Sequence, residues 1–426
     1  MLERISPVGP LRGALRLPGD KSISHRYAML GAVAEGVTRI RNYATGADCH
    51  STLECLRALG APVERQGAEV VISGRGLDGL QEAAGVLDAG NSGSTMRMLS
   101  GILAAQPFTT RIAGDESLSR RPMDRILRPL KAMGASIQAR EGRYPPLEIH
   151  GRALGPIDYT LPVASAQVKT CVLFAGLFAE GVTTVREPVR TRDHTELALR
   201  EFGAEIEVHE RVIAVRGPAR LEARELEAPG DLSTATFFLV AALLVPDSAL
   251  ALEQVGLNPT RAALLDFLTG MGADIRIPKV EQRAGELVGD ILVRHSRVRG
   301  GVIEKELTAA LIDELPVLAV LGAASEDGLV VRDAAELRVK ETDRIATLAE
   351  NLRRMGISVE VRPDGFRVSG QQRFRAAELD SFGDHRIAMA AAVAALLAEG
   401  ESTLAGAEAA AVSYPDFFRT LAGLRS

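Results

Sequence analysis

The chain has 426 residues, of which 46% are hydrophobic and 25% charged, a composition typical of a folded globular protein rather than a disordered one. The net charge is −5 and aromatic residues make up 4%, so we expect no nucleic acid as a partner. The three cysteines form no CxxC pair, which excludes a disulfide framework and a cysteine zinc site. The longest uncharged apolar run, residues 387–398, is too short for a membrane span, and residues 1–10 contain no apolar export signal. We therefore expect a cytoplasmic protein that does not contact membranes.

One pattern recurs six times along the chain, roughly every 70 residues: an amphipathic helix that ends in Gly and is followed by an alternating strand. Glycine after the last helical turn can adopt the left-handed conformation that lets the chain reverse into a strand. The pattern therefore predicts six repeats of one helix–strand unit. The helix-ending glycines are Gly60, Gly134, Gly203, Gly272, Gly356 and Gly423.

A second pattern alternates with the first and consists of Ala- and Gly-rich helices that lead into a turn and a strand. Because these helices have little polar surface, we expect them to be buried. A unit of two helices and several short strands cannot bury its own core, so six units should pack as three plus three. The near-copies PGDKSIS, at 18–24, and PGDLSTA, at 229–235, each open a buried helix and mark the expected crossovers. This predicts an inserted domain of residues 21–229 and a second domain made of 1–20 and 230–426.

The buried helices should begin near six residues whose types cap helix N-termini. Capping alone would explain each residue taken singly. Repetition should, however, aim the three helices of a domain in one direction, which gathers N–H groups and positive dipole ends into a site for anions. The six residues are Ser22, Ser94, Ser165, Ser233, Asp313 and Asp384.

Basic residues adjoin the same helix starts, despite the negative net charge. Arginine binds carboxylate or phosphate with two parallel hydrogen bonds, while lysine acts as a point charge. The residues alone thus predict a cleft between two domains that binds a small, multiply anionic ligand. The basic residues are Lys21, Arg26, Arg97, Arg120, Arg121, Arg125, Arg128, Lys169, Arg190, Arg192, Lys340, Arg344 and Arg386.

Two carboxylates lie among these cations. Asp313 in LIDELP is expected to open a helix, where it could serve as a cap or as a catalytic group. Glu341 in RVKETDR is expected in the first turn of a helix, beside Lys340 and Arg344. An acid beside cations at an anion site can exchange a proton with the bound anion.

Motifs for nucleotides, metals and nucleophilic catalysis are incomplete. Gly74, Gly76 and Gly79 match GxGxxG, but no long crossover helix follows them. Asp20-Lys21-Ser22 lacks the glycine that precedes lysine in a phosphate-binding loop, and no HExxH, GxSxG or clustered His/Cys set occurs. We therefore expect no nucleotide cofactor and no metal.

Eight motifs, in chain order, resemble those of the 3-phosphoshikimate 1-carboxyvinyltransferase (EPSP synthase) family, over essentially the whole chain. The resemblance implies an α/β fold, namely a two-domain inside-out α/β barrel of six βαβαββ repeats, three per domain, with the active site in the interdomain cleft. It implies enolpyruvyl transfer from phosphoenolpyruvate to the 5-hydroxyl of shikimate 3-phosphate, in the shikimate pathway to chorismate and aromatic amino acids. It implies no metal or organic cofactor, and we expect a monomer. The motifs are LPGDKSISHR, GNSGSTMR, SRRPMDRI, SAQVK, RTRDHTE, IDELP, RVKETDR and GDHRIAM.

The resemblance also implies the substrate contacts, position by position. Asp313 would be the base that takes the proton of the 5-hydroxyl, Glu341 would protonate the methylene carbon, and Lys21 would take part in proton transfer. The residues implied for shikimate 3-phosphate are Lys21, Ser22, Arg26, Ser165, Ala166, Gln167, Arg192, Asp313 and Lys340. Those implied for phosphoenolpyruvate are Lys21, Gly93, Arg121, Gln167, Arg344 and Arg386.

Two features depart from the family pattern. Val412 stands where many members have a lysine, so one phosphoenolpyruvate contact is missing or supplied from elsewhere. SAQ, TRDHTE and IDELP resemble the branch that tolerates glyphosate, whereas Gly93 resembles the sensitive form, which leaves the response to this inhibitor open.

Two alternative functions remain. A sister family transfers enolpyruvyl to UDP-N-acetylglucosamine and carries a reactive loop cysteine, which the matching stretch GDESLSRR, at 114–121, lacks. A non-catalytic anion-binding relative is the other alternative, and the intact Asp313, Lys340 and Glu341 argue against it.

Overall fold

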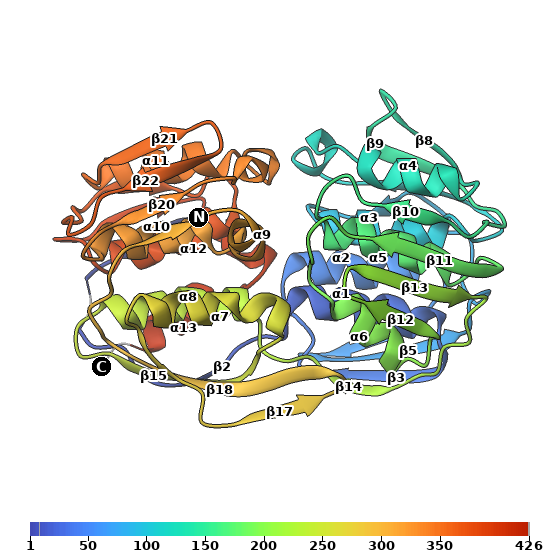
Figure 1. The fold of residues 1–426 in the computed structure, drawn as a ribbon, viewed down its shortest axis with the longest axis horizontal. Helices are drawn as coiled ribbons and strands as arrows, with labels where there is room; N and C mark the ends of the chain where they lie inside the picture. The colour runs from blue at the N-terminus through green and yellow to red at the C-terminus, as the bar shows by residue number, and fades with distance from the viewer. Residues whose placement is uncertain (8, 425–426) are drawn as a thin grey trace. The chain divides into compact units, whose positions relative to one another are not determined.

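A computed structural model describes residues 1–7 and 9–424 (Figure 1). The chain folds into two compact units, which we treat separately. The terminal unit comprises Met1–Leu17, Pro229–Gln282 and Leu287–Ser426, and the inserted unit comprises Pro18–Ala228 and Arg283–Glu286. No sequence pattern indicated that the short segment Arg283–Glu286 packs with the inserted unit.

The described part of the inserted unit forms three four-stranded sheets with one strand order, β14-β3-β5-β4, β6-β7-β9-β8 and β10-β11-β13-β12. In each sheet the first pair of strands is parallel and the other two pairs are antiparallel. The elements are α1 (Lys21–Val33), β3 (Glu35–Arg41), α2 (Ala47–Ala58), β4 (Val63–Gln66), β5 (Glu69–Arg75), β6 (Leu87–Asp88), α3 (Gly93–Leu103), β7 (Thr109–Ala113), η1 (Leu118–Arg120), α4 (Asp124–Ala132), β8 (Ser136–Arg140), β9 (Tyr144–His150), β10 (Asp158–Thr160), α5 (Ala166–Gly176), β11 (Gly181–Arg186), α6 (His194–Glu201), β12 (Ile206–His209), β13 (Val212–Gly217) and β14 (Glu225–Glu227).

The described part of the terminal unit repeats this plan with variations. Its sheets are β16-β18-β15-β2, to which β17 is added beside β18, β19-β20-β22-β21, and the three-stranded β1-β24-β23. The elements are β1 (Leu2–Ile5), β2 (Arg12–Arg16), α7 (Leu232–Leu244), β15 (Ala249–Gly256), α8 (Pro259–Gly270), β16 (Asp274–Arg276), β17 (Val280–Arg283), β18 (Glu286–Arg294), β19 (Gly301–Ile303), α9 (Glu306–Leu311), α10 (Leu315–Ala324), β20 (Leu329–Val331), η2 (Ala335–Val339), α11 (Arg344–Arg354), β21 (Val359–Arg362), β22 (Gly365–Val368), β23 (Glu378–Asp380), α12 (His385–Ala395), β24 (Ser402–Ala405), η3 (Ala407–Val412) and α13 (Phe417–Gly423).

Three sheets are completed by strands that are distant along the chain. β14 pairs in parallel with β3, Glu225 opposite Arg39, and so supplies the leading strand of the first repeat of the inserted unit. β2 pairs in parallel with β15, and β1 pairs antiparallel to β24. The predicted α/β fold of six related repeats is confirmed, but the repeats at the ends of each unit exchange strands.

The Ala- and Gly-rich helices form the interior of each unit. Every residue of α12 is buried, and so is every residue of α7 up to Leu243. Helices α7, α10 and α12 pack against one another in the terminal unit, and α3 packs against α1 and α5 in the inserted unit. A helix surrounded on all sides by protein needs no polar face, which explains these sequences. Among the described residues, each helix is too short or too polar to traverse a bilayer.

The predicted glycine caps are correct at five of six positions. Gly60, Gly134, Gly203, Gly272 and Gly356 have φ values of 81°, 100°, 87°, 97° and 82°, in the left-handed region. Gly423 differs, because it is the last residue of α13 and not the turn after it. No strand follows α13 among the described residues, and β1, from the other end of the chain, pairs with β24 in this repeat.

Candidate functional site

The helix N-terminal caps differ from the prediction at several helices. Ser165 and Asp384 cap α5 and α12 as expected, accepting hydrogen bonds from the N–H groups of Val168 and Arg386. Helices α1, α3 and α7 are each capped two residues earlier than expected, by Asp20, Ser92 and Asp231.

Ser22, Ser94 and Ser233 are therefore not the caps, and each is the second residue of its helix. The reason is geometric, because the capping side chain has to sit just before the first helical residue to reach the N–H groups of the first turn. Two of these hydroxyls have other partners: Ser94 accepts from Gln167 Nε2 at 2.9 Å, and Ser233 binds Glu314.

Lys21 and Arg26 lie on the first two turns of α1. Lys21 Nζ is 2.8 Å from Asp48 Oδ2, and both side chains are largely buried. The buried guanidinium of Arg26 donates to Thr195 Oγ1 at 2.7 Å and to Thr170 Oγ1 at 2.8 Å. Burial lowers the pKa of Arg26 to about 10, against the effect of nearby carboxylates such as Glu196. Arg26 therefore remains a cation at neutral pH.

His25, on the same helix, is affected by the charges of Lys21 and Arg26. Its ring is buried, with Nδ1 2.7 Å from Thr52 Oγ1. Burial lowers the pKa of His25 well below its ordinary value, and the charges of Lys21 and Arg26 lower it further. His25 is therefore neutral at pH 7.

Two guanidinium groups meet at the N-terminus of α3. A Cβ atom on Gly93, the first residue of this helix, would lie 2.7 Å from Arg97 Nη1 and 3.7 Å from Arg121 Nη1. Arg97 donates to Gln167 Oε1 at 2.9 Å, and Arg121 donates to Asn91 Oδ1 at 2.6 Å. Two cations and a helix N-terminus together form a site that suits an anion. Sequence reasoning noted Arg97 as a basic residue but assigned it no ligand.

The other residues assigned to the inserted unit lie at helix starts. Ser165 is the cap of α5, Ala166 is its first residue, and Gln167 follows. Arg192 is half-buried in the loop just before α6. The structure therefore places the residues assigned in this unit at or just before the N-termini of α1, α3, α5 and α6, with two exceptions: Arg26 lies in the second turn of α1, and Arg121 follows η1.

The terminal unit contains a second charged cluster, centred on Arg344. This buried guanidinium lies 2.7 Å from Asp384 Oδ2, 2.5 Å from Glu341 Oε2 and 3.5 Å from Asp313 Oδ1. Burial by itself lowers the pKa of Arg344, but the three carboxylates outweigh it and raise the pKa above its ordinary value. Arg344 is thus a permanent cation that holds three carboxylates in place.

Asp313 faces three cations within this cluster. Besides Arg344, Lys340 Nζ is 3.8 Å from its Oδ1 and Arg386 Nη2 is 3.9 Å from its Oδ2. Arg386 also donates to the backbone oxygen of Asp313 at 2.8 Å. Lys340, Arg344 and Arg386 therefore converge on one carboxylate, at distances of 3.5 to 3.9 Å.

Two predicted helix positions in this cluster are wrong. Asp313 does not cap a helix, because it lies in the turn between α9 and α10, and Glu314 occupies the position before Leu315. Glu341 does not lie in the first turn of α11, because that helix begins at Arg344 and is capped by Asp343. Both carboxylates consequently lie in loops, just before α10 and α11.

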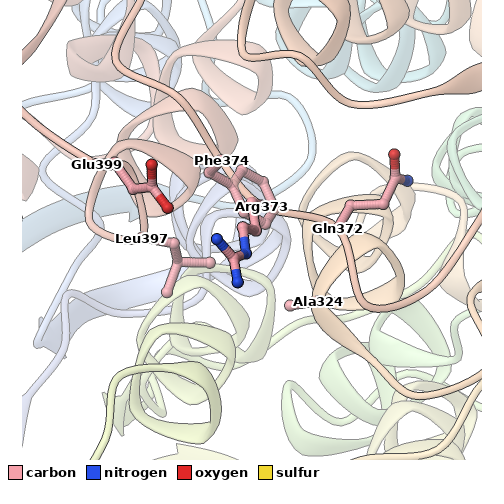
Figure 2. A pocket seen from close by; sticks show the side chains of 6 residues that line it. All are labelled: Ala324, Gln372, Arg373, Phe374, Leu397 and Glu399. Atoms are coloured by element: carbon pink, nitrogen blue, oxygen red, sulfur yellow. The ribbon is translucent and has the colours of Figure 1, made fainter.

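The cavity in Figure 2 lies away from these residues. It encloses about 250 Å³ and is lined by the six side chains that the figure labels. Ala324 is the last residue of α10, and Leu397 follows α12, so this cavity is at the C-terminal ends of the helices whose N-termini adjoin Asp313 and Asp384. The negative ends of helix dipoles disfavour anions. The anion site is therefore indicated by the charged clusters and not by this cavity.

Comparison with solved structures defines the class of protein. The enolpyruvyl transferase NikO from Streptomyces tendae has the same fold, with a TM-score of 0.78 at 21% identity over 99% of this chain and 97% of that chain. EPSP synthase from Acinetobacter baumannii superposes with a TM-score of 0.89 at 40% identity, over 100% of this chain and 98% of that chain. The structure thus has the enolpyruvyl transferase fold.

Sequence comparison identifies the family. A model of EPSP synthase (3-phosphoshikimate 1-carboxyvinyltransferase) matches residues 5–421, and the chain belongs to this family. The 3-phosphoshikimate 1-carboxyvinyltransferase of Solibacter usitatus is 67% identical over 99% of both chains. The corresponding protein of Koribacter versatilis is 54% identical over 98% of both chains.

The cysteines give a test that separates this family from the sister family with a reactive thiol. Cys49, Cys55 and Cys171 are buried, and burial raises the pKa of each thiol, to about 12 for Cys55. Only about one Cys55 in 10⁵ would then be a thiolate at pH 7. We expect no labelling by a thiol reagent in the native protein and three labelled thiols after unfolding, measured by mass spectrometry. Rapid labelling of one thiol in the native state would contradict this.

Proposed function

We propose that this chain transfers the enolpyruvyl group of phosphoenolpyruvate to the 5-hydroxyl of shikimate 3-phosphate, with release of phosphate, as a step of aromatic amino-acid biosynthesis. The observation that carries the proposal is the cluster around Asp313. Three cations surround this carboxylate, and one of them, Arg344, also binds Glu341. Such a cluster provides both the charge to bind anions and the groups to move protons.

The charges of the substrates match the residues that we propose to bind them. Each substrate carries a phosphate and a carboxylate, which arginine and lysine recognise. The proposed contacts to shikimate 3-phosphate are Lys21, Ser22, Arg26, Ser165, Ala166, Gln167, Arg192, Asp313 and Lys340. The proposed contacts to phosphoenolpyruvate are Lys21, Gly93, Arg121, Gln167, Arg344 and Arg386.

Arg97 extends the second set. It donates to Gln167 and adjoins the space above Gly93, so we propose that it takes the place of the contact that many members obtain from a lysine at the position of Val412. Val412 itself is half-buried at the end of η3. A guanidinium already directed at an anion site can supply the missing positive charge.

The proposed reaction divides between addition and elimination. Asp313 accepts the proton of the 5-hydroxyl as its oxygen attacks C2 of phosphoenolpyruvate, and Glu341 gives a proton to C3. Giving up this proton leaves Glu341 as a carboxylate, whose negative charge stabilises the positive charge that develops at C2. In the second step C3 returns a proton to Glu341 as the C2–O bond to phosphate breaks. The C2–C3 double bond forms again, phosphate leaves, and the product is an enol ether. Lys21 is proposed to assist these proton transfers.

The two units have complementary roles in this scheme. The inserted unit contributes cations and helix N-termini, and the terminal unit contributes the two carboxylates proposed for proton transfer. We therefore propose that both domains contribute residues to the binding of one pair of substrates. The domains are those predicted from the sequence, residues 21–229 and residues 1–20 with 230–426. We also propose that the enzyme is a cytoplasmic monomer that needs neither metal nor organic cofactor.

Phosphate release tests the proposed function. We expect release from phosphoenolpyruvate that depends on shikimate 3-phosphate and none with UDP-N-acetylglucosamine as acceptor. Release with the sugar nucleotide alone would assign the chain to the sister activity. Binding of shikimate 3-phosphate without any release would favour the non-catalytic alternative.

The roles of the carboxylates can be tested separately. Asp313→Asn and Glu341→Gln retain the side-chain size but remove proton transfer, so we expect kcat to fall about 10²–10⁴-fold. Glu350→Gln is the control, because Glu350 forms an exposed ion pair with Arg354 on α11 and should leave kcat unchanged. A kcat within threefold of wild type in either carboxylate variant would remove that residue from the mechanism.

The response to glyphosate can be tested at Gly93. The helical backbone accepts alanine there, but the new methyl group would lie 2.7 Å from Arg97 Nη1 and push this flexible side chain aside. We expect Gly93→Ala to raise the inhibition constant of glyphosate by more than it raises the KM of phosphoenolpyruvate. Equal increases in the two constants would contradict this expectation.

A further inference from the structure

Helix α6 starts against a buried ion cluster that has no part in the mechanism above. Lys169 Nζ, on α5, lies 2.6 Å from Glu196 Oε1 and 3.2 Å from Glu187 Oε2. The three side chains are between 0% and 4% exposed. A buried ammonium group is retained only where carboxylates compensate its lost hydration, so each partner depends on the others.

The two residues before Glu196 are also held by buried charges. His194 Nδ1 is 2.7 Å from Glu286 Oε1, which belongs to the short segment Arg283–Glu286 of the inserted unit. Thr195 Oγ1 accepts a hydrogen bond from Arg26 Nε at 2.7 Å. Three consecutive residues, the HTE of TRDHTE, thus attach the first turn of α6 to three different elements.

The ion cluster encloses a short loop. Glu187 directly follows β11, and His194 begins α6, so residues 188–193 form the connection between them. Within this loop, the hydroxyl of Thr191 donates to Glu187. Lys169 therefore holds the chain on both sides of the loop, and Thr191 links the loop itself to the cluster.

The cluster contains more negative than positive charge. Burial raises the pKa of Glu196, against the stabilising effect of Lys169, and the carboxylate of Glu187 raises it further. Glu196 Oε2 is buried and makes no hydrogen bond among the described residues. Apolar side chains could hold α6 against α5 without the cost of burying these charges. The ion cluster therefore indicates that the orientation of α6 and of the loop before it has to be fixed.

We propose that Lys169 is a positioning residue for shikimate 3-phosphate: by holding Glu187 and Glu196, it fixes loop 188–193 and thereby directs Arg192 toward this substrate. The inference rests on the proposed function, because the contact between Arg192 and shikimate 3-phosphate is part of it. Lys169 itself is fully buried, so we assign it no contact with a substrate. Its loss should therefore raise the KM of shikimate 3-phosphate and leave the KM of phosphoenolpyruvate almost unchanged.

Thr191→Val tests this with little risk to folding, because it removes one hydrogen bond from a half-buried side chain. We expect the KM of shikimate 3-phosphate to rise about 3–10-fold, the range that corresponds to the net free energy of one typical hydrogen bond. The KM of phosphoenolpyruvate and kcat should stay within twofold. Lys169→Met should give a larger rise with the same selectivity.

A double-mutant cycle separates positioning from general stability. If the cluster acts through Arg192, Thr191→Val should have no further effect in an Arg192→Ala background. Glu205→Ala is the matched control, because it removes an exposed ion pair with Arg216 in the same sheet, and it should change neither KM. Calorimetric titration with shikimate 3-phosphate should reproduce the losses in affinity.

The outcomes also distinguish the two proposals. Suppose that the wild-type protein turns over normally. Equal increases of both KM values in the Thr191→Val and Lys169→Met variants, or additive effects in the cycle, would then overturn the role of Lys169 and leave the proposed function intact. Wild-type protein that neither binds shikimate 3-phosphate nor releases phosphate would overturn the proposed function and this inference with it.

Discussion

The carboxylate of Asp384 connects the fold of the terminal unit to its chemistry. Its Oδ1 accepts from the N–H of Arg386 and so caps α12, a helix with no exposed residue. Its Oδ2 accepts from the buried Arg344 at 2.7 Å, and Arg344 in turn holds Asp313 and Glu341. The same side chain therefore compensates a helix dipole and a buried guanidinium, both of which need a negative charge. Without it, Arg344 would lose the partner that fixes its guanidinium against the two carboxylates proposed for proton transfer.

The inserted unit also contains buried cations, and one is held by neutral groups while the other is held by carboxylates. Arg26 is held by the hydroxyls of Thr195 and Thr170, and Lys169 is held by two glutamates. Hydroxyl partners leave the charge of Arg26 uncompensated at short range, which suits a residue proposed to bind a phosphate. Carboxylate partners neutralise Lys169, which suits a residue that only supports the structure around it.

Much of the fold could be predicted because its signals are local. An apolar helix surface and a glycine that ends a helix depend on near neighbours in the chain, and the repeat of about 70 residues shows the same local signals at regular intervals. The caps were predicted two residues too late at α1, α3 and α7 because Ser, Thr and Asp occur together there, and only the three-dimensional path selects the one that reaches the N–H groups. Gly423 was misassigned for a related reason, since the repeat it ends obtains a strand, β1, from the start of the chain.

The sequence by itself determined the helices, the repeat, the family and the residue types gathered at the helix starts, because these follow from periodicity and motifs. The tertiary structure decided which residues meet. Arg26 and Thr195 are separated by 169 positions, and Glu286 reaches His194 across 92. The place of Arg97 beside Gly93, and the cluster of Lys169 with Glu187 and Glu196, likewise depend on packing between elements. Such partners share no pattern along the chain, since ionic contacts form between whichever buried groups the packed helices and sheets bring within reach.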